Sequence, residues 1–379
     1  QAVATVCAKF AEPYWQRLDR EKRYPEEFVR ALTEGGWLAA LIPTEYGGAG
    51  LGMIEASLIL EEINASGGNG AACHAAMYTM GALVRHGSAE QKRRYLPDIA
   101  SGRLRLQSMA VTEPQAGSDT ARITTFARKE GDGYVLNGQK VFTSRVQHSD
   151  LMLVLARTTP IDRVIKKTDG MSLFLVDIHR AERSIEVRPI ETMVNHETNN
   201  LFMNDLALPA EALVGEEGSG FRQLLDGLNA ERILIAAESV GDARWLLQKS
   251  ISYAKERVVF GRPIGANQGI QFPIARAFMH TQAASLMRLR AAASFDAGKP
   301  SGAEANTAKL LASEAAWEAA EVAMTTHGGS GLTVEAGIER KFREARLYLV
   351  APVTNNLVMA YVAEHVLGLP RSYGMEGIA

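Results

Sequence analysis

The sequence predicts a mainly α-helical protein with a central β domain, because helical patterns occupy both ends of the chain and short β-rich runs occupy its middle. At 379 residues the chain is too long for one ordinary hydrophobic core, so two or three domains are expected. We predict an N-terminal helical domain over residues 1–107, an antiparallel β-sandwich or barrel domain over 108–214, and a C-terminal four-helix bundle over 215–379.

The N-terminal segment carries apolar residues at helical spacing. Phe28, Leu32 and residues 35–38 follow Pro25 and Glu26, two residue types that suit a helix start. A glycine-rich break over 43–52 then precedes two further expected helices, over 54–63 and 71–86.

The middle and the C-terminal segments differ in character. Residues 134–136, 151–155 and 172–176 are short apolar runs separated by turn residues, which is typical of strands. From Ser219 onward the chain is rich in Ala and Leu and amphipathic. Breaks near 261–269, 298–302 and 328–331 divide this part into the helices of a bundle.

Composition and charge exclude several classes of protein. Hydrophobic residues make up 46% and charged residues 22%, with a formal net charge of −2, so no general attraction to nucleic acid or to a membrane surface is expected. No apolar run approaches the ~20 residues of a membrane span. No signal peptide is visible, and we expect a cytoplasmic location, although a sequence that begins at Gln1 rather than Met leaves open whether a segment precedes it.

Metal and disulfide chemistry are not expected. Cys7 and Cys73 are the two cysteines, too few for a disulfide framework or a cysteine-based metal site, and they suit a reducing compartment. The eight histidines show no HExxH-like spacing, so the predicted metal content is none.

The most informative segment is Ala-Val-Thr-Glu-Pro-Gln-Ala-Gly-Ser-Asp, residues 110–119. Pro114 and Gly117 predict a sharp loop, and the hydroxyls and free amides around it can hold a large polar ligand. A solvated turn between strands is the simpler interpretation of such a cluster, but ten residues in this order form a longer pattern than a turn requires.

The segment resembles the flavin-binding signature A-x-T-E-P-x-A-G-S-D of the acyl-CoA dehydrogenase family. The likeness runs nearly end to end. Residues 37–52 are similar to the family's G-W-x-x-x-x-x-P-x-x-Y-G-G-x-G segment, 136–140 to its N-G-x-K strand, 257–261 with Gln268 to R-x-x-F-G…Q, and 327–331 to its G-G-x-G turn.

This resemblance implies an oxidoreductase of fatty acid metabolism. It implies a flavoprotein with FAD as cofactor, an acyl-CoA thioester as substrate, an electron-transfer flavoprotein as acceptor, and a homo-oligomer, either a tetramer or a dimer. It also implies the helical, β, helical domain order that the residue patterns predict.

The resemblance also implies which residues hold the cofactor. Phe142 stands where the family usually has a tryptophan that stacks on the flavin, and a phenylalanine can stack with less area. By residue type alone, Phe142 would be a core strand residue. The implied cofactor-binding residues are Val111, Thr112, Ser118, Phe142, Ser144, Arg257, Phe260, Gln268, Thr325, Gly328, Gly329 and Thr354, of which Arg257, Phe260 and Gln268 reach a neighbouring subunit's cofactor. The implied substrate-contacting residues are Ser118, Leu228 and Arg232.

The family's chemistry needs a carboxylate base in a dry pocket. Many members place a glutamate a few residues after an R-D-A motif, but counting from Arg343 that position holds Pro352, which can neither accept a proton nor donate a backbone N–H. Isovaleryl-type members carry the glutamate on the first bundle helix, just before an arginine, and Glu231-Arg232 matches that pattern. Glu231 borders an apolar stripe, so it is either useful or ion-paired within the bundle.

Three hypotheses follow from the sequence. The first is FAD-dependent α,β-dehydrogenation of an acyl-CoA thioester to the enoyl-CoA, with Glu231 as base. The second is a related flavin oxidase or monooxygenase. Pro352 favours this hypothesis because it stands where many family members carry the glutamate base. The third is a non-catalytic subunit of a heteromeric dehydrogenase. The sequence fixes neither the acyl chain nor the pathway.

Overall fold

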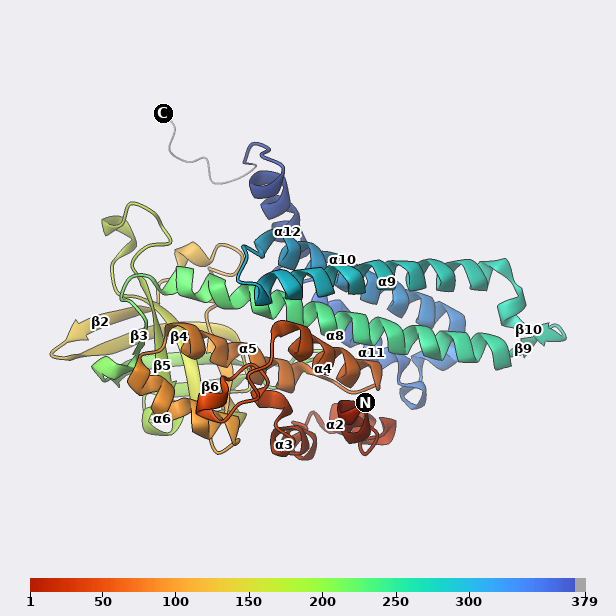
Figure 1. The fold of residues 1–379 in the computed structure, drawn as a ribbon, viewed down its shortest axis with the longest axis horizontal. Helices are drawn as coiled ribbons and strands as arrows, with labels where there is room; N and C mark the ends of the chain where they lie inside the picture. Colours follow the sequence, from red (N-terminus) through yellow and green to blue (C-terminus); the bar gives the residue numbers. More distant parts are fainter. Residues whose placement is uncertain (372–379) are drawn as a thin grey trace. The chain divides into compact units, whose positions relative to one another are not determined.

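The structure is a computed structural model that describes residues 1–371 (Figure 1). Its contacts group the chain into two compact units. The sheet unit comprises residues 21–51 and 71–228, and the bundle unit comprises 1–20, 52–70 and, within the described residues, 229–371. The predicted boundaries at 107/108 and 214/215 stay a prediction. The predicted fold class is confirmed, because helices precede and follow a set of strands in the middle of the sequence.

The helices of the sheet unit follow the expected pattern with one difference. The helix expected through residue 38 ends at Glu34, because Gly36 takes a left-handed conformation at φ +74° and the chain continues as a short 3₁₀ turn. The helical segments of this unit are α3 (Glu26–Glu34), η1 (Trp37–Ala39), η2 (Thr44–Tyr46), α5 (Ala71–His86), α6 (Ala89–Ala100), η3 (Thr120–Arg122), η4 (Val146–His148), η5 (Ile161–Arg163), α7 (Ile178–Ala181) and η6 (Ala210–Ala212).

The sheet of this unit has eight strands. They are β1 (Leu106–Ala110), β2 (Phe126–Glu130), β3 (Gly133–Ser144), β4 (Leu151–Arg157), β5 (Met171–Asp177), β6 (Ile185–Pro189), β7 (Thr198–Leu208) and β8 (Leu213–Val214). The order is β6-β7-β3-β2-β4-β5-β8, and β1 pairs with β4. Most pairs are antiparallel as expected, while β1 and β2 both lie parallel to β4.

Strand β4 shows why the apolar runs form buried strands. All seven of its residues are buried, and side chains alternate between the two faces of a strand. Leu151, Leu153 and Leu155 enter the core that also contains residues of α5 and α6, whereas Met152 and Val154 enter the core on the opposite face. A strand buried on both faces reads as a continuous apolar run rather than an alternating one.

The bundle unit consists of long helices packed through small residues. On α10 (Gly302–His327), Ala316, Ala319 and Ala323 recur at helical spacing and are fully buried, and Ala277 of α9 (Gln268–Asp296) joins the same core. The α-helices are α1 (Ala2–Cys7), α2 (Glu12–Glu21), α4 (Met53–Ala65), α8 (Gly220–Glu256), α9 (Gln268–Asp296), α10 (Gly302–His327), α11 (Ile338–Tyr348) and α12 (Asn355–Tyr361), and residues 220–228 of α8 group with the sheet unit. Shorter elements are the antiparallel pair β9 (Val258–Val259) and β10 (Arg262–Pro263) and the short helical segments η7 (Ile264–Ala266), η8 (Gly328–Leu332), η9 (Val334–Ala336) and η10 (Val362–Val366). The predicted breaks at 261–269, 298–302 and 328–331 fall between α8, α9, α10 and α11 (Figure 1).

Buried charges tie α4 to later helices of the bundle unit. The Glu61 carboxylate accepts hydrogen bonds from both Arg244 and Arg288. Asn64 donates to Asp242 across 2.9 Å, and Lys341 reaches the same carboxylate across 2.5 Å. Since an unpaired buried charge is strongly destabilising, these contacts fix which helices pack together.

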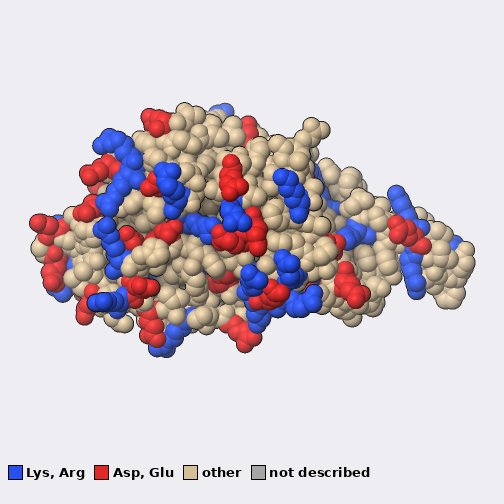
Figure 2. All heavy atoms as spheres, turned by 90° about the horizontal axis from the view of Figure 1, so that it is seen from below, with Lys and Arg blue, Asp and Glu red and all other residues tan. Residues whose placement is uncertain are grey.

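Surface charge is mixed on the face that Figure 2 shows. Basic and acidic side chains lie interspersed there, which fits the net charge of −2. Within residues 1–371, no helix is long and apolar enough to cross a membrane.

Candidate functional site

The loop after β1 is folded tightly onto β3. Glu113 and Ala116 exchange two backbone hydrogen bonds, of 3.2 and 3.0 Å, which close the turn around Pro114. The Val141 amide donates to the carbonyl of Thr112 across 2.8 Å. Val111 and Thr112 are half-buried and Ser118 is exposed, so all three are open to a ligand on this loop.

Beneath this loop lies a buried ion pair that the sequence analysis missed. Glu113 and Lys140 approach to 3.0 Å, and their side chains are 1% and 0% exposed. Burial opposes the charge on Glu113, but the Lys140 ammonium and the hydrogen bonds from Thr125 and Thr124 outweigh it, so the pKa of Glu113 falls to about 2. Both residues lie within quoted motifs, but their separation of 27 positions gives no sign that they meet.

Phe142 lies next to this loop in a strained and exposed position. Its ring is 63% exposed, and its φ of +57° is uncommon for a residue with a bulky side chain. The pairing of β3 with β7 shifts between Lys140 and Thr143, so a bulge turns Phe142 outward. An exposed aromatic ring that the backbone holds at a cost is suited to stacking on a planar ligand.

Ser144 is the next residue on that side of β3. Its hydroxyl accepts a hydrogen bond of 2.8 Å from the amide of Asn195. Asn195 itself has φ +58°, and its carbonyl oxygen Oδ1 accepts from Arg145 across 2.8 Å. The structure therefore brings Val111, Thr112, Phe142 and Ser144 together within the sheet unit, with Asn195 as a neighbour that only the folded chain reveals.

A second set of predicted residues gathers at one end of the bundle unit. The ring of Tyr253 stacks on that of His327 with centroids 4.4 Å apart, which places the end of α8 beside the end of α10. Arg257 and Phe260, which follow Tyr253, are exposed, and Phe260 is fully so. Gln268 begins α9 and is exposed too.

The turn after α10 is open to a ligand's close approach. Gly328 has φ +56°, and a Cβ atom at Gly328 or Gly329 would meet nothing within 4 Å. Thr325 is exposed one turn before it. Such a turn lets backbone amides approach phosphate oxygens. Thr354 lies elsewhere, at the N-cap of α12, where its hydroxyl accepts from the Leu357 amide at 3.4 Å.

The candidate base lies on α8 in the bundle unit. Glu231 is 7% exposed, and the following residue, Arg232, donates to Asn229 across 2.9 Å. Burial lowers the pKa of Arg232, whereas the charges of Glu231 and Tyr361 act to raise it. Leu228, the other predicted substrate residue on α8, is half-buried against the core of the sheet unit. Pro352 lies in the loop between α11 and α12.

That loop is held by a buried lysine. The Lys309 ammonium donates to the carbonyl of Val353 and to the side-chain oxygen of Asn355, both across 2.7 Å. Burial and the charge of Arg232 lower the pKa of Lys309 to about 8. The sequence analysis did not select Lys309, because a lysine on an Ala-rich helix is ordinarily a surface residue.

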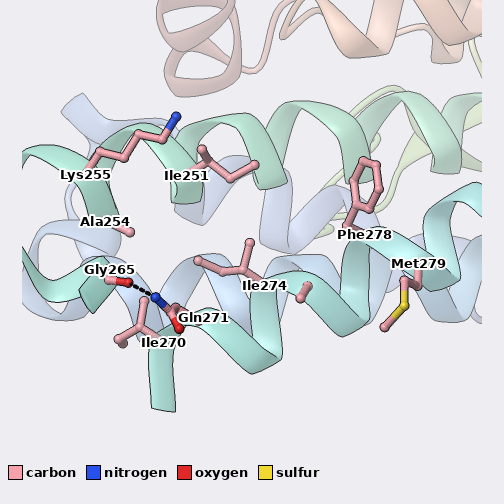
Figure 3. A pocket seen from close by; sticks show the side chains of 10 residues that line it. Ile251, Ala254, Lys255, Gly265, Ile270, Gln271, Ile274, Phe278 and Met279 are labelled. Carbon is pink, nitrogen blue, oxygen red and sulfur yellow. Dashed lines mark hydrogen bonds between the residues drawn. The ribbon is translucent and has the colours of Figure 1, made fainter. Parts of the chain in front are cut away.

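A hollow of about 410 Å³ lies between α8 and α9 (Figure 3). Its walls are apolar, with Ile251, Ile270, Ile274, Phe278 and Met279 among them, and Gln271 donates to the Gly265 carbonyl at its edge across 2.7 Å. None of the predicted site residues lines it. In the part of the chain that the structure describes, no three His, Cys, Asp or Glu side chains are grouped to hold a metal ion.

Comparison with known proteins gives a consistent result over the whole chain. Family models described as the N-terminal, middle and C-terminal domains of acyl-CoA dehydrogenase match residues 1–103, 108–206 and 218–367. The chain is 37% identical to acyl-CoA dehydrogenase FadE12 of Mycobacterium tuberculosis over 378 residues, covering 98% of this chain and 96% of the relative.

Solved structures agree. The glutaryl-coenzyme A dehydrogenase glutaryl-CoA complex has a TM-score of 0.91 at 29% identity, covering 98% of this chain and 94% of that one. The prolyl acyl carrier protein oxidase AnaB has a TM-score of 0.89 at 26% identity, covering 97% of each chain.

The chain belongs to the acyl-CoA dehydrogenase family. It is an oxidoreductase and a flavoprotein with FAD as its cofactor, and the family's reaction is the dehydrogenation of acyl-CoA thioesters. The residues present fit such a cofactor. Phe142 offers a bare aromatic face beside the open edge of the 110–119 loop, and Gly328 and Gly329 leave the space that a phosphate group needs.

Proposed function

We propose that this chain dehydrogenates an acyl-CoA thioester to the enoyl-CoA with Glu231 as the base. The observation that carries the proposal is a nearly buried carboxylate on α8, at the position that isovaleryl-type relatives use, in a chain whose other base position is Pro352. The proposed cofactor contacts are the residues that the resemblance implies, on β3 and the 110–119 loop, just after α8, at the start of α9, at the end of α10 and in the turn that follows it, and at Thr354.

In this mechanism the Glu231 carboxylate accepts the proton from the carbon α to the thioester carbonyl. When bound, FAD supplies the acceptor for the hydride that leaves the β carbon. Arg232 lies beside Glu231, and the negative charge of Glu231 favours the charged form of the Arg232 guanidinium. Low exposure of Glu231 keeps water from competing for the base.

Glu231→Gln tests the base, because the change keeps size and removes the carboxylate. Anaerobic reduction of the flavin by acyl-CoA substrates should slow by ~100-fold or more, the usual scale for loss of a general base. The FAD content should stay near that of the wild type. Glu256→Gln, at the exposed end of the same helix, serves as the control. Reduction at the wild-type rate in the Glu231→Gln protein would place the base elsewhere.

An oxidase is the second candidate function. Pro352 and the structural likeness to a prolyl acyl carrier protein oxidase favour it. Hydrogen peroxide produced in step with product would support the oxidase, whereas a need for an electron-transfer flavoprotein as acceptor would support the dehydrogenase. Flavin that stays oxidised with every acyl thioester would favour the third hypothesis, a non-catalytic subunit.

We also propose a homotetramer, a dimer of dimers assembled through the C-terminal bundle. The support is the apolar hollow between α8 and α9 and the exposed side chains of α9, namely Phe272, Phe278, Met279 and Leu286, which are 49–69% exposed in a single chain. Light scattering at micromolar concentration should give the mass of four chains, and the mass of one chain would contradict the assembly.

A further inference from the structure

The Glu113–Lys140 pair is more extensively bonded than a simple ion pair. One carboxylate oxygen of Glu113 accepts from Lys140 and from the Thr125 amide, at 3.0 and 2.9 Å. The other accepts from the Thr124 amide, the Thr124 hydroxyl and the side chain of Gln115, at 2.7, 2.9 and 3.0 Å. Both oxygens are thus fully used by the protein itself, so Glu113 has no remaining capacity for a ligand.

Lys140 also binds the backbone near the start of the 110–119 loop. Its ammonium donates to the carbonyl of Val111 across 2.9 Å as well as to Glu113. The next residue along β3, Val141, donates its amide to the Thr112 carbonyl. Two consecutive carbonyls of the loop are therefore held by two consecutive residues of β3, and the bulge that exposes Phe142 begins at the same point.

Stability alone is a poor reason for such a pair. Removing two charges from water is costly, and apolar residues of similar volume often stabilise a core as well or better. The charges add geometric specificity, since charge-assisted hydrogen bonds are shorter and stronger than neutral ones. Here they fix the backbone on both sides of the loop, at Val111 and at residues 124–125.

We propose that Glu113 and Lys140 are positioning residues for the flavin. They set the backbone of Val111 and Thr112 relative to Phe142, so that the loop and the aromatic ring present one preformed surface to the isoalloxazine. This inference rests on the proposed placement of the flavin against these three residues. Neither charged group contacts the cofactor, and both act through the backbone that they hold.

The test uses the holoprotein and two single variants, Glu113→Gln and Lys140→Met. Dilution of each protein, followed by flavin fluorescence, gives the dissociation constant of FAD. We expect binding to weaken by about tenfold or more, equivalent to ~1.4 kcal/mol, because part of the binding free energy is then spent on ordering the loop. The absorbance maximum of the bound flavin should shift as well, since the loop no longer holds one arrangement around it.

Two controls separate positioning from general loss of stability. Glu130→Gln removes a carboxylate from an exposed ion pair with Arg128 in the neighbouring strand β2. Leu136→Ala opens a cavity in the core on one face of β3 and destabilises the sheet unit, while it leaves every hydrogen bond of Glu113 and Lys140 in place. Both should keep FAD affinity within about threefold of the wild type, measured on folded protein, with an unchanged flavin spectrum.

The outcomes are distinct. Wild-type affinity and spectrum in Glu113→Gln and Lys140→Met would overturn the inference, and so would an equal loss of affinity in Leu136→Ala, which would show that stability alone explains the effect. Failure of the proposed function appears separately, as a wild-type protein that holds FAD but is not reduced by any acyl-CoA.

Discussion

Two lysines of this chain are equally buried, but the charges and hydrogen-bond acceptors around their ammonium groups differ. Lys140 in the sheet unit and Lys309 in the bundle unit are both 0% exposed, and in both burial lowers the pKa to about 8. Lys140 faces the carboxylate of Glu113, so its surroundings are neutral overall. Lys309 donates to a carbonyl and an amide oxygen. The charge of Arg232 also lowers the pKa of Lys309, and the smaller effect of the Glu314 carboxylate opposes this.

The comparison teaches that burial and pKa alone do not describe a charged residue. At Lys140 the buried ammonium is paired with the Glu113 carboxylate, so removing either side chain leaves the other charge buried without a partner of opposite sign. At Lys309 the ammonium donates to the loop between α11 and α12, and its removal leaves no buried carboxylate without a counter-charge. The same substitution at the two positions should therefore have different consequences, and the following measurements can sharpen or break this contrast.

The largest effect is expected for Lys140→Met. The substitution leaves the Glu113 carboxylate buried without its counter-charge, and such a change costs about 3–5 kcal/mol. Urea unfolding gives the free-energy change, with the exposed Lys129→Met on β2 as control. The double variant Glu113→Leu with Lys140→Met should be less destabilised than the two single variants summed. A loss below about 1 kcal/mol in Lys140→Met would remove the distinction between the two lysines.

Acid should abolish the contribution of the same pair. The folded-state pKa of Glu113, about 2, lies below the ordinary value of 4.5, so the unfolded chain takes up this proton first as pH falls. The stability that Glu113 contributes is full above pH 4.5 and is lost as pH falls toward 2, on the order of 3 kcal/mol in all. Unfolding curves between pH 6 and pH 3 should show the advantage of the wild type over Glu113→Gln shrinking, with Glu130→Gln tracking the wild type. A constant advantage across this range would mean that Glu113 is not ionised in the folded protein.

A smaller effect is expected for Lys309→Met. The carbonyl of Val353 and the side chain of Asn355 lose a donor, which costs about 1–3 kcal/mol, but no carboxylate is stranded. Because the folded-state pKa of about 8 lies below the ordinary 10.5, the unfolded chain binds more protons between these values, and the wild type should gain stability over the variant as pH rises from 8 to 10. Unfolding at pH 7.5 and pH 10 measures this, with exposed Lys299→Met as control. A loss as large as that of Lys140→Met would contradict the comparison.

The fold was largely predictable because its signals are local. The apolar run at 151–155 lies within β4, and the glycine clusters at 261–269 and 298–302 separate helices as expected. The early end of α3 was missed because Gly36, an ordinary residue in a sequence, takes a left-handed conformation that ends the helix.

The candidate site was predictable only in part, because its contacts are distant in sequence. Phe142 and Ser144 could be selected from a motif, but the strain at Phe142 and the hydrogen bond from Asn195, which lies 51 positions after Ser144, exist only in the folded chain. Glu113 and Lys140 belong to two recognised motifs, at 110–119 and 136–140, but neither motif indicates that the two side chains form an ion pair. The roles of the site residues, including Glu231, stay predictions.

The way the chain is divided between its two units also determines which parts can fold while the chain is still being synthesised. All segments of the sheet unit precede residue 229, so this unit is complete in the nascent chain before most of the C-terminal helices exist. Helix α4 has to wait, because Glu61 on α4 finds Arg244 only 183 residues later. At ordinary rates of synthesis that interval is roughly 10–40 s. During that time α4 can pack only against N-terminal residues such as those of α1, and the Glu61 carboxylate is without its two arginines, so the final packing of α4 depends on helices that are synthesised late.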